Sequence, residues 1–326
     1  MLQLYPKIKP NKEYKFKVDD IHEIYVAEYG TETGIPVICC HGGPGGETIR
    51  SEVRLFDPEF YRIIAFDQRG CGKSTPYNCV KNNNTQLLIS DIELIRNKLD
   101  IEKWIVAGGG WGSTLALLYS EAHPDVVARM LLWSICLLRK RDLNWIYVDG
   151  ANRFFPEHWR KLGKALTKDE RKSDMDMLEI FYDKLLGKDD FARINVAKAW
   201  SYWESHCATL HLNNDVVHYF REPHIALNLA LMSCHYFVNN VFIKENQILD
   251  DIEKIAKIPA KIIHGRYDML SPLENADMLH RKLPFSELQI IREAGHAFVE
   301  AGIIDALVRS TREILRELGY NDLTIL

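Results

Sequence analysis

Two polar side chains in the last quarter of the chain have the types and the order of a catalytic acid and a catalytic base. Asp268 follows the apolar run 260–265, and His296 follows the apolar run 288–291. A carboxylate that orients a histidine, with that histidine as general base, is an arrangement for acyl transfer. Asp268 could instead cap a helix beginning near Pro272, and His296 is one of twelve histidines. Their order, each directly after a predicted strand, favours the functional interpretation.

Acyl transfer also needs a nucleophile and hydrogen-bond donors for the oxyanion. Residues 106–114 read V-A-G-G-G-W-G-S-T, which predicts a strand, a tight turn and a helix. This is the layout of the G-x-S-x-G nucleophile turn, and on that alignment Gly110 stands where the serine belongs. The candidate oxyanion donors are the backbone N–H groups of Gly43, in the glycine-rich loop 42–46, and of Trp111. That loop alone could also be an ordinary glycine turn.

The elements that must position these residues alternate between strands and helices. Apolar runs predict strands at 22–29, 36–40, 62–66, 104–106, 128–133, 260–265 and 288–291, and a period of 3.6 predicts helices at 85–99 and 303–318. Such alternation predicts a mostly parallel sheet with helices on both faces. Together with the layout of residues 106–114, it indicates the α/β-hydrolase fold. Residues 134–245 are helix-like and rich in aromatic residues, so we expect a helical cap there. Residues 1–133 and 246–326 then form the core.

Composition narrows the class of protein. The chain has 326 residues, a net charge of −4 and 47% hydrophobic residues, which indicate a folded domain with a large core. No block of like charge predicts binding to nucleic acid or to a membrane surface. The seven cysteines show no C-x-x-C spacing, and residues 1–20 show no signal-peptide core. We therefore expect a cytoplasmic protein with reduced thiols; its oligomeric state is not readable from these features.

Six segments together resemble the prolyl aminopeptidase (proline iminopeptidase) family. They are His41-Gly42-Gly43-Pro44-Gly45, Asp67-Gln68-Arg69-Gly70-Cys71-Gly72, Gly108 to Thr114, Ala199-Trp200-Ser201-Tyr202-Trp203-Glu204, His235-Tyr236-Phe237-Val238-Asn239 and Gly265-Arg266-Tyr267-Asp268. The resemblance covers nearly the whole chain, including the predicted cap. It implies an enzyme that removes N-terminal proline from peptides or small amides without a metal or cofactor. It also implies that Asp268 is the acid, His296 the base, and Gly43 and Trp111 the oxyanion hole, with Glu204 binding the substrate's free amine.

The same resemblance shows where this chain departs from the family. Gly110 replaces the nucleophile, and Ser233 stands where a second cap glutamate would contact the amine. Aromatic residues around the proline ring correspond to Cys136 and Ile146 here, whereas Phe237 is retained. Glycine has no nucleophilic atom, and removal of a catalytic serine costs on the order of 10⁶ in turnover. We therefore expect the chain to be inactive, or nearly so, as an aminopeptidase.

Three explanations of Gly110 stay open. The chain is an inactive form engineered to trap substrate, or a natural pseudoenzyme that binds peptides or a protein partner through the cleft, or a hydrolase of altered specificity that uses water or Ser113. The second explanation accounts for several changes around one pocket at once. Ser113 lies about one helical turn beyond Gly110, which places it too far along to reach His296.

A metal site is a weaker alternative for the predicted cap. His206, Cys207 and His211 lie close together in sequence, and His235 adjoins Cys234. Their neighbours are apolar and aromatic, and no further set of ligands matches a metal-site spacing. We therefore expect these residues to pack within the cap and not to hold a metal.

Overall fold

The computed structural model describes residues 1–47, 52–172 and 176–320. In these residues eight strands form one sheet in the order β1-β2-β4-β3-β5-β6-β7-β8. The β1–β2 and β2–β4 pairs are antiparallel, and all other neighbours are parallel. The prediction of a mostly parallel α/β sheet is confirmed. The strands are β1 (Lys12–Lys17), β2 (Glu23–Gly30), β3 (Ile35–Cys40), β4 (Tyr61–Phe66), β5 (Trp104–Gly110), β6 (Val127–Ile135), β7 (Ala260–Gly265) and β8 (Ser286–Ile291).

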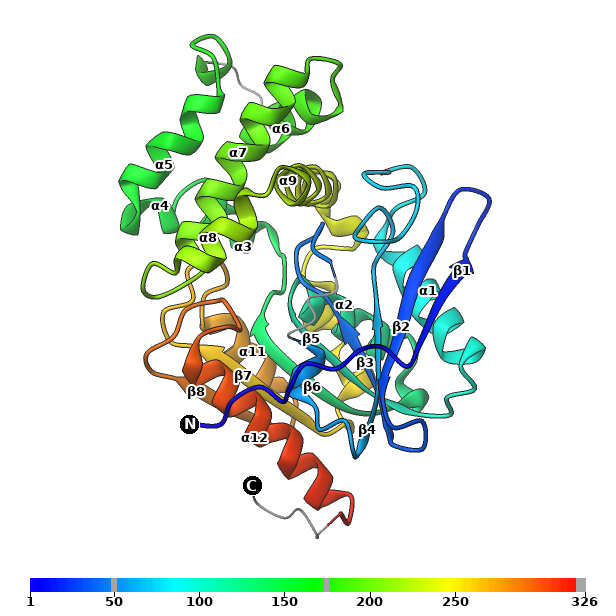
Figure 1. Ribbon diagram of the computed structural model, residues 1–326. Helices are drawn as coiled ribbons and strands as arrows, with labels where there is room; N and C mark the ends of the chain where they lie inside the picture. Colours follow the sequence, from blue (N-terminus) through cyan, green and yellow to red (C-terminus); the bar gives the residue numbers. More distant parts are fainter. Residues whose placement is uncertain (48–51, 173–175, 321–326) are drawn as a thin grey trace.

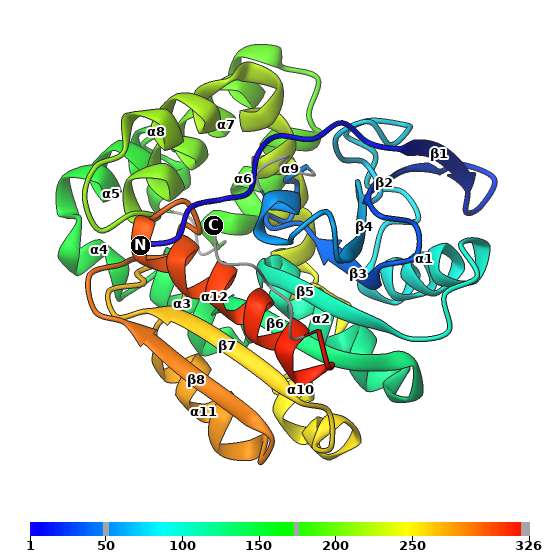
Figure 2. The same cartoon turned by 60° about the horizontal axis from the view of Figure 1, so that its bottom comes forward.

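Helices cover both faces of this sheet (Figures 1 and 2). Successive side chains of a strand point to opposite faces, so Val106 of β5 packs in one hydrophobic cluster while Ile105 and Ala107 pack in the other. The Val106 cluster holds the apolar faces of three helices, and the second cluster holds that of a fourth. They are α1 (Thr85–Lys98), α2 (Trp111–Ala122) and α11 (Glu274–Lys282) on the first face and α12 (Ala301–Glu317) on the second.

The helix limits agree with their local signals. The side chain of Asn84 accepts a hydrogen bond from the backbone N–H of Leu87, so Asn84 is the N-cap of α1. The α12 helix begins at Ala301, two residues before the predicted start. Its apolar face, which includes Ile303 and Ile314, is buried against the sheet.

A helical segment is inserted between β6 and β7. The β6 strand runs to Ile135, two residues beyond the boundary expected from sequence, and the first inserted helix begins at Lys140. Helices α5, α6 and α7 stand away from the sheet, and α9 lies between α6 and α7 and the sheet (Figure 1). The inserted helices are α3 (Lys140–Tyr147), α4 (Ala151–Phe154), α5 (Pro156–Leu162), α6 (Met177–Leu186), α7 (Asp190–Cys207), α8 (Asn214–Arg221), α9 (Pro223–Val238) and α10 (Gln247–Asp250).

None of the single helices in the described part of the chain is long and apolar enough to cross a membrane. The segments Pro223–Val238 and Asn240–Asp250 pass a test of length and composition only as a pair, with a bend of 74° between them.

Candidate active site

The turn between β5 and α2 has the backbone conformation of a nucleophile elbow. Gly110 ends β5 with φ +56° and ψ −128°, a region in which glycine avoids the steric cost of a Cβ atom. A close approach also fixes Gly112, because a Cβ atom there would lie 2.0 Å from the carbonyl oxygen of Cys40. The first turn of α2 therefore packs directly against the end of β3. Residue 110 is held at the carboxyl edge of the sheet with no side chain.

Asp268 and His296 meet at the same edge of the sheet. Asp268 follows β7 and His296 follows β8, and Nδ1 of His296 lies 3.0 and 2.9 Å from the Oδ1 and Oδ2 atoms of Asp268. A carboxylate only accepts, so Nδ1 donates the hydrogen and Nε2 is left as the acceptor. Burial opposes the charged imidazolium, but the Asp268 carboxylate outweighs that effect, and the pKa of His296 is raised.

The free Nε2 atom of His296 faces Gly110. A Cβ atom on residue 110 would lie 3.1 Å from Nε2, a tight contact. The imidazole is therefore placed where it would accept a proton from a hydroxyl on residue 110. The predicted acid and the predicted base are in contact, next to an elbow in which residue 110 has no side chain.

Asp268 also accepts hydrogen bonds from backbone N–H groups, those of Leu270 at 3.1 Å and Ser271 at 2.7 Å. Asp268 does not cap a helix near Pro272, however, because α11 begins at Glu274 and its N-cap residue is Leu273, without a side-chain cap. These bonds fix the carboxylate on the turn that follows β7. The orientation of His296 thus depends on a carboxylate that the backbone itself holds in place.

A second histidine, which sequence reasoning missed, stands beside the same carboxylate. Nε2 of His264, in β7, lies 3.4 Å from Oδ2 of Asp268 and donates to the Ser271 carbonyl at 2.8 Å. Its Nδ1 accepts from the backbone N–H of Ile135 at 3.0 Å. Burial lowers the pKa of His264, so the ring is neutral and holds three segments together. Its position four residues before Asp268, at a strand end, is the signal that could have found it.

The two candidate oxyanion donors belong to the glycine-rich loop 42–46 and to the residue that follows Gly110. Gly43 lines the cavity, whereas Trp111 is the first residue of α2, where backbone N–H groups lack partners within the helix. The indole Nε1 of Trp111 donates to Oε1 of Gln68 at 2.7 Å, and the Gln68 side chain donates to the carbonyl of His41 at 3.0 Å. Gln68 therefore joins the start of α2 to the loop that carries Gly43.

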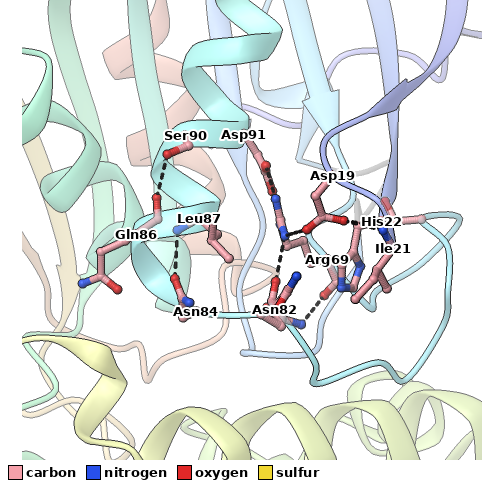
Figure 3. A network of polar contacts seen from close by, with 12 residues as sticks. Asp19, Ile21, His22, Arg69, Asn82, Asn84, Gln86, Leu87, Ser90 and Asp91 are labelled. Atoms are coloured by element: carbon pink, nitrogen blue, oxygen red, sulfur yellow. Dashed lines mark hydrogen bonds and ion pairs between the residues drawn. The ribbon is translucent and has the colours of Figure 1, made fainter.

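A buried arginine anchors the loop that presents Gln68 (Figure 3). Nε and Nη2 of Arg69 donate to the two carboxylate oxygens of Asp91 at 2.6 and 2.7 Å, and Nη1 donates to Asp19 at 2.5 Å. Nη1 also donates to the carbonyl of Asn82 at 2.7 Å. The fork geometry of a guanidinium suits this double carboxylate contact. The network ties the loop after β4 to α1 and to the N-terminal hairpin.

A cavity of about 480 Å³ opens above Gly110 and His296. Its volume lies in the range of small-molecule sites. Core loops and inserted helices both contribute to its walls. The lining residues are Gly42, Gly43, Gly46, Glu47, Glu52, Gly109, Gly110, Trp133, Glu204, Ala208, Asn213, Asp215, Val216, Tyr219, Phe220, Ile225, Leu229, Leu270, His296, Ala297, Phe298 and Val299.

Glu204 brings a carboxylate from α7 into this cavity. Its Oε1 accepts a hydrogen bond from the hydroxyl of Tyr147 at 2.6 Å. Burial raises the pKa of Glu204, although the Tyr147 hydroxyl and the charge of His296 act in the opposite direction. A cationic group that entered the cavity would stabilise the charged carboxylate.

Four further residues that we expected around the substrate lie outside the cavity lining, unlike Glu204. The Ser233 hydroxyl donates to the Pro44 carbonyl at 3.0 Å, and the ring of Phe237 lies 5.8 Å from that of Tyr147. Cys136 and Ile146 are buried in the core. None of these four side chains is among those that line the cavity. Their proposed contact with a ligand therefore stays a prediction.

The histidines and cysteines of the helical segment between β6 and β7 pack against neighbouring side chains or bond to the backbone. His206 stacks on Tyr202 with ring centroids 4.0 Å apart, Cys207 is buried in the core, and Nε2 of His235 donates to the Asn83 carbonyl at 2.7 Å. Within the described residues, no group of three or more histidine, cysteine or acidic side chains could hold a metal ion.

Comparison with known proteins places this geometry in a family. Residues 35–302 match the family model of the alpha/beta hydrolase fold. The chain is 42% identical to a proline iminopeptidase of Xylella fastidiosa over 312 residues, which span 95% of this chain and 99% of that protein. It is also 42% identical to a proline iminopeptidase of Arabidopsis thaliana (97% and 83% covered) and 36% identical to one of Neisseria meningitidis (97% and 100%).

The chain belongs to the proline iminopeptidase family of α/β hydrolases. This is the family that its sequence motifs resemble, so that prediction is confirmed. Among solved structures, a bromoperoxidase of Bacillus anthracis is similar, with a TM-score of 0.63 and 19% identity, covering 94% of this chain and 100% of that one. An esterase of Exiguobacterium antarcticum has a TM-score of 0.59 and 19% identity, covering 91% and 96%. At this identity the two structures support the shared fold.

Proposed function

We propose that this chain binds the amino-terminal end of a prolyl peptide in the cavity above Gly110 and does not form a covalent acyl intermediate. The observation that carries the proposal is the pairing of a Gly110 elbow with a complete Asp268–His296 pair. Names of relatives at 36–42% identity supply the ligand class. The chain is then a proline iminopeptidase-like binding protein, with at most residual hydrolysis.

The proposed binding mode divides the ligand between core and inserted helices. Glu204 holds the free amine, and the N–H groups of Gly43 and Trp111 point at the carbonyl oxygen of the proline. In this proposal residues 134–245 act as a cap on the core formed by 1–133 and 246–326. Ser233, Phe237, Cys136 and Ile146 shape the region around the proline ring from behind the lining.

Catalysis in the family requires a hydroxyl between the carbonyl carbon and the base. Without it, His296 can activate only a water molecule, which lacks the fixed position of a side chain. The Ser113 hydroxyl is no substitute, because it donates to the Gly110 carbonyl at 2.7 Å and accepts from the N–H of Cys136 at 3.1 Å. It is also fully buried and makes no part of the cavity.

Binding without turnover is tested on the chain itself. Thermal unfolding is followed with prolinamide and with its N-acetyl derivative, and turnover is measured on a proline-arylamide. We expect prolinamide to raise Tm, the acetylated compound to leave it unchanged, and hydrolysis to be near background. Glu204→Gln should abolish the Tm shift. Turnover by the unmodified chain that His296→Ala abolishes would contradict the proposal and favour a water-using hydrolase.

A reversion separates the two origins of Gly110. Gly110→Ser restores the hydroxyl, and Gly110→Ala is its matched control because it restores only the Cβ atom. Strong cleavage of the proline-arylamide by the serine variant alone would mean that the rest of the site is intact, as in an engineered trap. A serine variant that binds but stays inactive would mean that the pocket has diverged, as in a natural pseudoenzyme. The codon at position 110 in the gene is the simplest further discriminator.

The cysteines support the proposed cytoplasmic location. All seven are free thiols, and six of them are buried. Reduced thiols are typical of proteins in reducing compartments.

A further inference from the structure

The cavity contains a second buried carboxylate that the proposed binding mode does not use. Glu52 lines the cavity and is only 5% exposed. In the described part of the chain, its carboxylate takes part in none of the hydrogen bonds or ion pairs that the side chains form. Burial alone raises its pKa, to about 8. An unpaired carboxylate in such a place destabilises the fold, and sites of this kind are commonly functional.

A buried hydroxyl without a partner lies in the same part of the cavity. The phenolic oxygen of Tyr219, on α8, is shielded from solvent and has no hydrogen-bond partner among the described residues. Tyr219, Glu47 and Glu52 all line the cavity, and the charges of both glutamates act on the Tyr219 hydroxyl. Two lining residues, one with an acceptor and one with a group able to donate or accept, thus have no hydrogen-bond partner among the described residues.

This region is separate from the Glu204 site. The charge of Glu204 acts on His296, whereas that of Glu52 acts on Tyr219 and on the thiols of Cys39 and Cys40 at the end of β3. The cavity thus has two acidic regions with the Gly110 elbow in its wall.

The charges of the lining favour a ligand with more than one positive group. Its acidic members are Glu47, Glu52, Glu204 and Asp215, and none of the described lining residues is a lysine or an arginine. Among the described lining residues, His296 is the one basic side chain. A single amine bound at Glu204 would leave Glu52 buried without a partner among the described residues. A second cation on the same ligand would give it a charge-assisted partner.

We propose that Glu52, with the hydroxyl of Tyr219, forms a second cation subsite that selects peptides with a basic side chain next to the N-terminal residue. The inference rests on the proposed function, because the ligand's amino terminus is held at Glu204. The ammonium of a lysine or the guanidinium of an arginine contacts the Glu52 carboxylate. Tyr219 accepts a further hydrogen bond from the same group. The ligand, or substrate, is thus a peptide whose first two residues have two positive charges, one on the terminal amine and one on the second side chain.

The test compares two ligands that differ in one charge. Prolyl-lysine amide and prolyl-norleucine amide are titrated calorimetrically into the full chain. A charge-assisted hydrogen bond predicts about tenfold tighter binding of the lysine compound. In Glu52→Gln, which keeps the shape of the side chain, the two ligands should bind equally, with the norleucine affinity unchanged. Tyr219→Phe should reduce the preference in part.

Matched controls make the outcome specific to Glu52. Asp215→Asn removes another acidic lining residue and should keep the preference. Arg50 and Arg54 are both two residues from Glu52; Arg54 donates to the Tyr5 carbonyl, whereas Arg50 lies outside the described residues, so Arg50→Gln is made as well. A preference that survives in Glu52→Gln, or that is lost in Asp215→Asn instead, overturns the proposal. A preference that appears only in Arg50→Gln also overturns it, because Glu52 would then be neutralised within the chain.

The two proposals fail in different ways. Equal binding of both amides by the unmodified chain, abolished by Glu204→Gln, overturns the Glu52 subsite and leaves the proposed function standing. Binding of neither amide overturns both. The melting temperature of each variant is measured in parallel, and Glu52→Gln should be at least as stable as the parent, because the raised pKa of the Glu52 carboxyl costs the folded state stability at neutral pH.

Discussion

The glycine at the elbow has a consequence for stability that can be measured without any substrate. Gly110 has φ +56°, and a Cβ atom there would lie 3.1 Å from Nε2 of His296. A residue other than glycine in a sparsely populated backbone region costs of the order of 1–3 kcal/mol. We therefore expect Gly110→Ala to lower the free energy of unfolding by about 1–3 kcal/mol. Because the new Cβ atom is also in tight contact with the imidazole, we expect a loss above the lower limit of this range.

Serine at the same position adds one favourable contact to the same cost. Its hydroxyl can donate to Nε2 of His296, and a net hydrogen bond contributes about 1 kcal/mol. Gly110→Ser should therefore be destabilising, by about 1 kcal/mol in net effect, and less so than Gly110→Ala. Urea unfolding of the three proteins at pH 7, with equal m-values, gives both differences. Alanine and serine variants as stable as the parent would refute the reasoning, since the elbow would then carry no strain.

The double variants with His296→Ala isolate the hydrogen bond. Removing the imidazole relieves the 3.1 Å contact and deletes the acceptor, so the serine and alanine variants should become equally stable. If the serine variant stays more stable than the alanine variant without His296, the serine hydroxyl must form its hydrogen bond elsewhere in the cavity.

Three other side chains give independent predictions. Glu121 is buried with both carboxylate oxygens unpartnered among the described residues, and burial raises its pKa to about 8. The unfolded chain releases this proton near the ordinary glutamate pKa, so the parent loses stability as pH rises from about 4.5 to 8, by on the order of 1.4 kcal/mol per unit. The stabilising effect of Glu121→Gln should therefore grow over that range in urea titrations, and a constant difference would contradict it. Arg69→Met leaves the Asp91 carboxylate buried and unpaired and should cost about 3–5 kcal/mol, whereas a loss below about 1 kcal/mol would mean that water replaces the guanidinium. Ser113→Ala should cost about 1–2 kcal/mol by leaving the Cys136 N–H without its acceptor, and should not change any residual turnover, which would reject Ser113 as a nucleophile if observed.

The fold was readable from the sequence because its signals are local. Buried parallel strands such as 36–40 and 62–66 are short continuous apolar runs, and each was found within a residue or two of its observed limits. The exact end of β6 was not readable, because Ile135 pairs with Gly110 of β5 only after a register shift that leaves Ser134 without a partner on β5. The β1 strand reads K-E-Y-K-F-K and is mostly solvent-exposed. Its strand conformation therefore depends on antiparallel pairing with β2 and could not be predicted from its own composition.

The sequence predicts those parts of the candidate site whose positions follow from the order of the strands. Asp268 and His296 could be paired because both follow adjacent strands of a parallel sheet, whose carboxyl ends share one edge. Their roles remain predictions. The position of His264 at a strand end gave a signal, but its contacts with Ser271 and Ile135 did not. Glu52 gave no signal, because what defines it is burial without a partner among the described residues. Burial without a partner is a tertiary property, and no local pattern reports it.

The buried carboxylates link ligand binding to stability in a way that does not depend on catalysis. Glu204 and Glu52 both have pKa values raised by burial, so each costs free energy in the empty cavity at neutral pH. A ligand cation that pairs with either one removes part of that cost and stabilises the folded chain. If the cavity had lost its ligand along with its nucleophile, substitutions to glutamine at these positions would be stabilising and unopposed. The presence of both carboxyl groups is therefore better explained by a cavity that still binds cations than by a decayed enzyme.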